Sequence, residues 1–540
     1  MKSRLALLGL VAGVCRRAKH IAAFLILFLG FQCGEAHGQV VATWTDSSGN
    51  WSNPANWSTL TVPNGDYNVT INVPGAAVKV DLAATVDTLT VGASSSLHIN
   101  AGSQLVSIPG DSLISGISSN SGTLINSGGL DIIEGRMGSE FINFGTLTNT
   151  AGVLIYGVPT INSGVLKNFG VLSVDGGCCL INTGTIVIGV RGAIAIDNGS
   201  LNSSSSLMNK GTIDLQVGTL TNTGKLTNSG AIVLESQAAS VGNYGLLSNT
   251  GTIGILAGPC GGGFENGSGA VLNNSGTIYI NVGISHGPCG AGFGNGGIFD
   301  NKGVIDLGNL GNGGTLSNSG TLLNSGKLTI FSSALLATST NYTQKAGSTV
   351  VDGTLTATNG AIVDIKHGSL IGSGTINGNV LMGGTLMPEA NSVLPLTGNP
   401  GDATPGTLTI FGDYEQTHTG TFDELLSPSS HSLLDVNGKA VLDHGSELEI
   451  ALLNGFNPID QTFDIMDYSS LTGVFANGSS FWDDGFLWDV TYGPNQIDIT
   501  AIQAQAADPP SPTPEPSSFL LLGLGALTFS AFVRRHAVAR

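Results

Sequence analysis

Charged and aromatic residues are scarce in this chain of 540 residues. Only 10% of the residues are charged and 6% are aromatic, whereas 41% are hydrophobic. That apolar fraction is too high for a disordered chain, and the 80 glycines follow no three-residue period, which excludes collagen. The composition therefore predicts an ordered chain of many short strands and tight turns, with a core made mainly of Leu, Ile and Val.

Basic residues are the rarer charge, with 19 Lys and Arg against 37 Asp and Glu. The formal net charge is −18, and several of the basic residues lie in the two terminal segments. An acidic surface of this kind repels nucleic acid and anionic lipid. We therefore expect no nucleic-acid partner.

Sequence spacings typical of catalysis and metal binding are also missing. The chain has no CxxC pair, no HExxH motif and no phosphate loop that ends in Lys-Ser or Lys-Thr. Carboxylates are scattered between residues 86 and 390, where Arg136 and Arg191 are the only arginines. We predict no enzyme activity, no catalytic residue, no metal ligand and no cofactor.

A polysaccharide lyase or hydrolase is the alternative, because such enzymes need clustered carboxylates or a base with an arginine. Asp483 and Asp484 lie beside Trp482 and Trp488, which would suit a sugar site. We favour a solvated turn for these two aspartates.

The N-terminal residues have the three-part layout of a secretory signal peptide. A basic region ends at His20, an apolar run covers 21–31, and Ala36 and Gly38 place small residues at positions −3 and −1 of a cleavage site. We expect signal peptidase to cleave after Gly38, so that residues 1–38 are the signal peptide.

The C-terminal residues combine a Pro-rich linker, an apolar stretch and a basic tail. The linker contains Pro514, Glu515 and Pro516, the apolar stretch covers 519–533, and Arg534 and Arg535 begin the tail. This arrangement resembles the PEP-CTERM sorting signal. The resemblance implies recognition by a membrane exosortase, with transient anchoring through the C-terminal segment, in bacteria that make exopolysaccharide. A plain membrane anchor is the alternative.

The middle of the chain repeats the pattern Asn-x-Gly-x-(Leu/Ile). Many copies come in pairs six residues apart, and the pairs recur at intervals of about 20 residues, as in solenoid repeats. The copies begin at Asn120, Asn126, Asn143, Asn162, Asn168, Asn182, Asn209, Asn222, Asn228, Asn243, Asn249, Asn274, Asn301, Asn312, Asn318 and Asn324.

Residues 220–234 show how one repeat would fold. Leu226, Ile232 and Leu234 alternate with outward residues such as Lys225, which is the period of a strand. Asn and Gly both tolerate positive φ, so we expect each Asn-x-Gly to bend the chain. Three short strands and three bends would make one coil of a parallel β-helix, with equivalent asparagines bonded in a ladder.

This repeat region resembles filamentous-haemagglutinin and autotransporter passenger domains. The resemblance implies an all-β, right-handed parallel β-helix. The predicted order is a signal peptide at 1–38, a Trp-rich N-terminal cap at 39–85, and β-helix repeats at 86–399. The order continues with a β-rich C-terminal cap at 400–505 and a Pro-rich linker at 506–516. It ends with the sorting tail at 517–540, which contains a hydrophobic helix.

Two further sets of residues are candidate sites. Trp44, Trp51 and Trp57 are interpreted as an apolar lid, with glycan stacking as the functional alternative. Cys260 and Cys289 lie in near-duplicate segments 29 residues apart, so neighbouring coils would bring them within disulfide reach. Two free thiols are the alternative for that pair, and the state of Cys178 and Cys179 stays open.

The sequence thus favours an exported, non-catalytic protein of the cell surface or extracellular matrix. Its function would be adhesive or structural, in association with exopolysaccharide and biofilm. A passive spacer would have the same sequence features.

Overall fold

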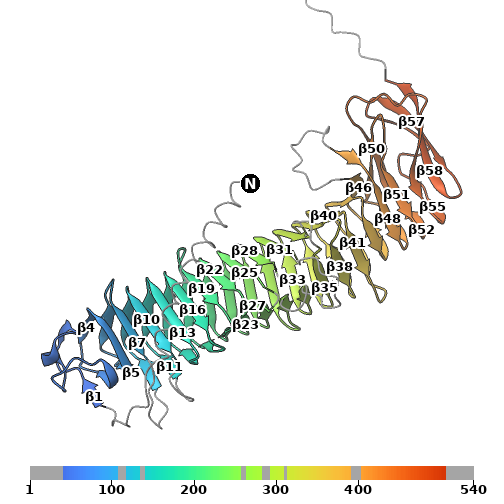
Figure 1. Cartoon of the computed structure of the whole chain (residues 1–540). Coiled ribbons are helices and arrows are strands. Elements are labelled where there is room, and N and C mark those ends of the chain that lie inside the picture. The colour runs from blue at the N-terminus through green and yellow to red at the C-terminus, as the bar shows by residue number, and fades with distance from the viewer. Residues whose placement is uncertain are drawn as a thin grey trace, which may run out of the picture. The chain divides into compact units, whose positions relative to one another are not determined.

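A computed structural model describes residues 40–107, 117–133, 140–236, 238–256, 263–281, 292–308, 313–390 and 403–505. By backbone contacts the chain divides into two compact units. The first contains 1–214 with 218–220, and the second contains 215–217 with 221–540. Both units consist of stacked coils of short parallel strands. Figure 1 shows, within each unit, the strands of successive coils lying next to one another. The predicted all-β parallel β-helix is confirmed.

The regular coils of the first unit contain three strands each. One coil has β14 (Thr160–Asn162), β15 (Val165–Asn168) and β16 (Val171–Asp175), and the next has β17 (Cys179–Asn182), β18 (Thr185–Ile188) and β19 (Ala193–Ile196). Each strand pairs in parallel with its equivalent in the next coil, so Asn162 lies opposite Asn182. The prediction of three strands per coil is therefore confirmed.

The second unit repeats the same arrangement. One coil has β29 (Gly263–Asn266), β30 (Val271–Asn274) and β31 (Thr277–Ile280), and the next has β32 (Phe293–Asn295), β33 (Ile298–Asn301) and β34 (Val304–Leu307). Leu226, Ile232 and Leu234 are completely buried while Lys225 is exposed, as the alternation predicts. The interior is a continuous column of such aliphatic side chains.

Stacked asparagine side chains form the predicted ladder inside the coils. In the second unit Asn228 Nδ2 donates to Asn249 Oδ1 at 2.7 Å, and Asn249 Nδ2 donates to Asn274 Oδ1 at 2.7 Å. The same ladder continues to Asn301 and Asn324, each step 2.8 Å long. A buried amide is costly without partners, and the identical residue of the next coil supplies one.

Bending at the Asn-x-Gly steps does not require positive φ, so that part of the prediction is wrong. Within the described ranges no motif asparagine or glycine has a positive φ. The glycines instead permit close stacking: a Cβ built on Gly164 would lie 2.1 Å from Gly145 O, and one on Gly303 would lie 2.1 Å from Gly276 O. Any side chain there would overlap the backbone of the preceding coil.

Parallel pairing continues beyond residue 403 before the topology changes. β50 (Thr421–Leu426) pairs in parallel with β53 (Glu447–Leu452), and β51 (Leu433–Val436) with β54 (Thr462–Asp467). β54 then pairs antiparallel with β58 (Gln496–Ala504), which pairs with β57 (Phe486–Tyr492). The predicted boundary at 399/400 lies outside the described residues, so the domain limits stay a prediction.

The helical content of the described part is a single 3-10 turn, η1 (Pro54–Asn56). Within these ranges no helix has the length and apolarity needed to cross a bilayer. The signal and sorting helices were predicted for 1–38 and 517–540, which lie outside the described residues.

Candidate functional site

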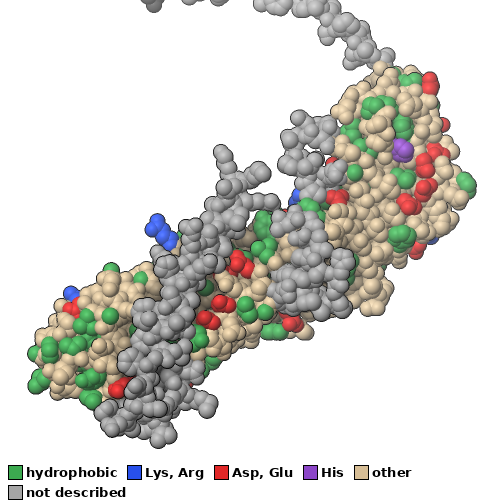
Figure 2. All heavy atoms as spheres, in the orientation of Figure 1, with side chains coloured by type: hydrophobic (Ala, Val, Ile, Leu, Met, Phe, Trp, Pro, Cys, Tyr) green, Lys and Arg blue, Asp and Glu red, His purple; other side chains and the backbone are tan. Residues whose placement is uncertain are grey.

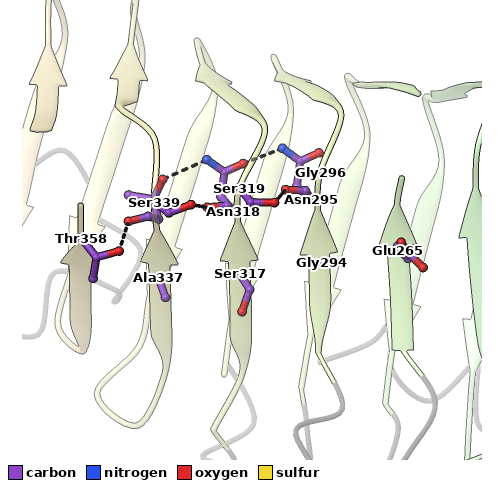
Figure 3. A pocket seen from close by; sticks show the side chains of 11 residues that line it. Glu265, Gly294, Asn295, Gly296, Ser317, Asn318, Ser319, Ala337, Ser339 and Thr358 are labelled. Carbon is purple, nitrogen blue, oxygen red and sulfur yellow. Dashed lines mark hydrogen bonds between the residues drawn. The ribbon is translucent and has the colours of Figure 1, made fainter. Parts of the chain in front are cut away.

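A shallow hollow of about 460 Å³ is lined by residues of five neighbouring coils of the second unit. It lies on the outer side of β29, β32, β35 (Thr315–Asn318) and β38 (Leu335–Thr338), and reaches the bend after β41 (Thr354–Ala357). Figure 3 shows the side chains that line it. These are Glu265, Gly294, Asn295, Gly296, Ser317, Asn318, Ser319, Ala337, Thr338, Ser339 and Thr358.

The hollow exists because the outward positions of its central strands carry little or no side chain. Gly294, Ser317 and Ala337 are the outward residues of β32, β35 and β38. The inward residues of the same strands, Phe293, Leu316 and Leu336, are buried. Phe264 and Phe293 stack at a centroid distance of 4.6 Å with their planes 9° apart. Small outer residues over a filled interior leave a groove without leaving a void in the core.

Hydrogen bonds fix the polar floor of the hollow. Asn266 Nδ2 donates to Asn295 Oδ1 at 2.7 Å, and Asn295 Nδ2 donates to Asn318 Oδ1 at 2.6 Å. The ladder ends where Asn318 Nδ2 donates to Thr338 Oγ1 at 2.9 Å (Figure 3). Buried amides held on both sides do not reorient, so the bends above them keep their positions.

An exposed aromatic ring and a carboxylate lie at one end of the hollow. Tyr244 is 48% exposed, and its hydroxyl donates to Glu265 Oε2 at 2.9 Å. The ring lies over the next coil, because a Cβ built on Gly267 would be 2.4 Å from Tyr244 Cδ1. The hydrogen bond to Glu265, with burial and the nearby negative charge, raises the pKa of the Tyr244 phenol. The phenol therefore stays protonated and keeps donating at neutral pH.

Charge near the hollow is negative and low. Glu265 is the single ionisable residue among those that line it. On the face shown in Figure 2, uncharged polar side chains and backbone dominate the described surface, and acidic groups outnumber basic ones. The arrangement offers hydroxyls, amides, one aromatic face and one carboxylate, a set that suits uncharged or cationic polar ligands.

The three predicted cap tryptophans are buried. Trp44, Trp51 and Trp57 are each no more than 1% exposed, and Trp57 makes edge contacts with the other two at centroid distances of 5.0 and 4.7 Å. The indole N–H of Trp57 donates to Trp51 O at 2.9 Å. Buried rings offer no face to a sugar, so the structure favours the apolar lid over glycan stacking at these residues.

Cys178 and Cys179 are free thiols in this structure. Burial raises the pKa of both thiols, and the Sγ of the buried Cys178 donates to Asp175 O at 2.8 Å. A raised pKa lowers the thiolate fraction and with it the reactivity. Cys260 and Cys289 lie outside the described residues, as do Gly38, Pro514, Glu515, Pro516, Arg534 and Arg535, so the disulfide and the cleavage positions stay predictions.

Asp483 and Asp484 have a role that neither interpretation of the sequence included. Asp483 Oδ2 accepts a hydrogen bond from Ile450 N–H at 2.6 Å, and Asp484 Oδ2 accepts one from Leu452 N–H at 2.7 Å. The two carboxylates therefore contact the backbone of β53.

Sequence reasoning missed two rows of neighbouring carboxylates in the last coils. Burial, with Glu449 and Asp483 nearby, raises the pKa of Asp423 to about 6. Burial, with Asp467 and Asp498 nearby, does the same for Asp464. The sequence does place an acidic residue at an outward position of each of these strands. Predicting that the carboxylates are neighbours also requires the pairing of β50 with β53 and of β54 with β58.

In the described part of the chain no three His, Cys, Asp or Glu side chains are grouped to hold a metal ion.

Comparison with known proteins gives a match to a sorting motif and a similarity to solved structures. The PEP-CTERM protein-sorting motif matches residues 512–535. No curated protein matches the chain. The chain is similar to the crystal structure of the Haemophilus influenzae Hap adhesin, at 11% identity and a TM-score of 0.25. The similarity covers 81% of this chain and 63% of that chain, so this chain spans less than two thirds of its length.

The chain carries a PEP-CTERM protein-sorting motif near its C-terminus, and this motif implies export and processing by an exosortase. The predicted resemblance of its C-terminus to this signal is therefore confirmed.

Proposed function

We propose that this exported protein has an adhesive or structural function at the cell surface or in the extracellular matrix, where it binds exopolysaccharide without cleaving it. One observation carries the proposal: the polar hollow of about 460 Å³, with the exposed ring of Tyr244 and the carboxylate of Glu265 at one end. A sugar ring stacks its C–H face on an aromatic ring while its hydroxyls bond to amides, hydroxyls and carboxylates.

Rigidity supports binding by this surface. The amide ladder under the hollow is buried, and each of its steps from Asn266 to Asn318 is 2.7 Å or shorter. A surface that is already ordered loses little conformational entropy when it binds a ligand. Many weak contacts along the coils then add up, as they do in multivalent binding.

Co-sedimentation of the purified exported protein with the host's exopolysaccharide tests this function. We expect the protein to pellet with the polymer while the polymer's chain length stays constant. Shortening of the polymer would instead establish the lyase or hydrolase alternative. If the protein does not bind and the polymer is not shortened, the result would favour the spacer interpretation.

A pair of tyrosine variants locates the binding surface. Tyr244→Ala removes the ring beside the hollow, and we expect binding to weaken by up to about tenfold, the value of one aromatic contact. Tyr156→Ala is the matched control, because Tyr156 is 39% exposed, lies on β13 (Gly152–Tyr156) of the first unit and does not line the hollow. Equal binding by both variants would remove the hollow from the proposal.

Anchoring and processing at the C-terminus are part of the same proposal. The apolar stretch at 519–533 would hold the chain in the membrane until the exosortase cleaves near Pro514, Glu515 and Pro516. Signal peptidase would act after Gly38. The mass of the mature protein tests both cleavages, since a mature chain that still contains Arg540 would contradict processing.

A further inference from the structure

The outer edge of β53 is bonded to side chains in place of another strand. N–H groups of Glu447 and Leu453 face β50, with Gly420 O and Leu426 O as their acceptors. Because strand residues alternate, the N–H groups of Leu448, Ile450 and Leu452 face the opposite way. On the other side of β53, β50 supplies the backbone of a parallel neighbour.

Three side chains satisfy that outer edge. Asn477 Oδ1 accepts Leu448 N–H at 2.8 Å, and Asn477 Nδ2 donates to Leu448 O at 3.0 Å. Asp483 accepts Ile450 N–H at 2.6 Å, and Asp484 accepts Leu452 N–H at 2.7 Å. These side chains, named here the edge-closing set, reproduce the alternate spacing of a neighbouring strand without supplying a backbone.

A tight hairpin presents the two aspartates to this edge. β56 (Ser480–Asp483) and β57 are joined by Asp484 and Gly485, whose φ values are +41° and +80°. A two-residue loop with positive φ at both positions is the type I′ turn, for which Asp-Gly is a preferred sequence. The turn chemistry therefore fixes where the carboxylates lie.

An unpaired strand edge is a template for pairing with another chain. We propose that the edge-closing set ends the β-helix by blocking the free edge of β53. When this edge is uncovered, it pairs with the same edge of a second copy of the chain. Identical edges pair antiparallel about a two-fold axis, with Ile450 opposite Ile450 and Leu448 opposite Leu452.

The strand sequence favours that occupant. In this register the buried-type residues Leu448 and Ile450 fall on one face of both copies. Glu449 lies opposite Ala451, so no two carboxylates face each other directly across the new pair.

The test combines hydrogen exchange with sedimentation on the full-length protein carrying Asp483→Ala and Asp484→Gly. Glycine keeps the positive φ of the turn and removes only the carboxylate. In dilute solution we expect the amides of Ile450 and Leu452 to exchange at least tenfold faster than in the wild type, because these two lose their acceptors. At high concentration we expect a dimer and renewed protection of the same amides.

Two variants keep the interpretation sharp. Asp483→Asn with Asp484→Asn retains an acceptor oxygen on each residue, and should stay monomeric and protected. Asp489→Ala removes an exposed carboxylate from the same hairpin on β57 and should behave as the wild type.

Several outcomes would overturn the proposal. Rapid exchange of 447–453 in the wild type would show that the edge is not closed, and this measurement needs no variant to fold. A variant that exchanges rapidly yet stays monomeric at every concentration would eliminate the second copy as the occupant.

Discussion

The Asn-x-Gly coils at 221–330 and the last coils at 403–505 bury polar side chains in opposite ways. In the first region buried amides bond to the equivalent asparagine of the next coil, as Asn249 does with Asn228 and Asn274, until the two ladders end at Asn318 and Asn324. In the second region Glu424 is completely buried on β50, and neither of its oxygens has a hydrogen-bond partner in the described part of the chain. Repetition supplies partners for polar groups, and the end of a repeat must find them elsewhere.

The pKa of Glu424 reflects this difference. Burial of the carboxyl raises its pKa well above the ordinary value. The nearby Ser432 N–H donates to Leu425 O at 2.9 Å and is therefore engaged with the backbone. The amides next to Asn249 hydrogen-bond to its side chain, whereas no neighbouring group in the described part of the chain hydrogen-bonds to the Glu424 carboxyl.

Breaking the ladder should have the largest effect. Asn249→Leu keeps a side chain of similar size but leaves an unpaired donor on Asn228 and an unpaired acceptor on Asn274. We expect the free energy of unfolding of the second unit to fall by about 3–5 kcal/mol, from two orphaned buried groups. Chemical denaturation measures this, and Asn273→Leu, at an exposed position of β30, is the control. Equal effects of the two substitutions would show that the ladder contributes little.

Filling a glycine position should cost somewhat less. In Gly303→Ala the new Cβ would lie 2.1 Å from Gly276 O, so the two coils must separate locally. We expect a loss of about 1–3 kcal/mol, as for other overpacked sites. Gly254→Ala is the matched control, because no atom lies within 4 Å of its Cβ position and its φ is not positive. That control should be neutral or slightly stabilising in thermal unfolding.

Glu424→Leu should change stability in the direction opposite to Asn249→Leu. Replacing a buried carboxyl that no neighbour bonds removes a desolvation cost and orphans nothing. We expect a gain of about 1–2 kcal/mol in the free energy of unfolding. A loss as large as that of Asn249→Leu would mean that Glu424 has an essential partner.

The smallest expected effect is a pH dependence confined to the last coils. Asp423 and Asp464 have folded pKa values of about 6 against an ordinary 3.8, so the folded state holds extra protons between these values. The free energy of unfolding should therefore fall as pH rises from about 4 to about 6 and level off above that. Because both groups are partly exposed, solvent screens them, and we expect a total on the order of 1 kcal/mol.

Thermal unfolding at about pH 5 and about pH 7.5 measures this slope. The double variant Asp423→Asn, Asp464→Asn should flatten it, because neither amide titrates. A slope that persists in the double variant would assign the effect to other groups.

The repeat made much of the fold predictable. The spacing of the Asn-x-Gly motifs and the alternation around Leu226 and Ile232 predicted three strands per coil, parallel stacking and the amide ladder. The reason for the glycines could not be predicted, because the overlap between Gly303 and Gly276 arises between coils that are 27 residues apart in sequence. The hollow was missed for the same reason, since Tyr244, Glu265 and Ser317 come from three different coils.

By itself the sequence determined two features of this protein. They are the sorting motif near its C-terminus and the period at which inward aliphatic residues recur with each coil. Both are encoded by residues close together in the chain. Tertiary structure alone decided which outward residues become neighbours, because coil lengths vary and the register between coils sets those contacts. The hollow beside Tyr244 and the closed edge of β53 depend on that register, as do the raised pKa values of Asp423 and Asp464.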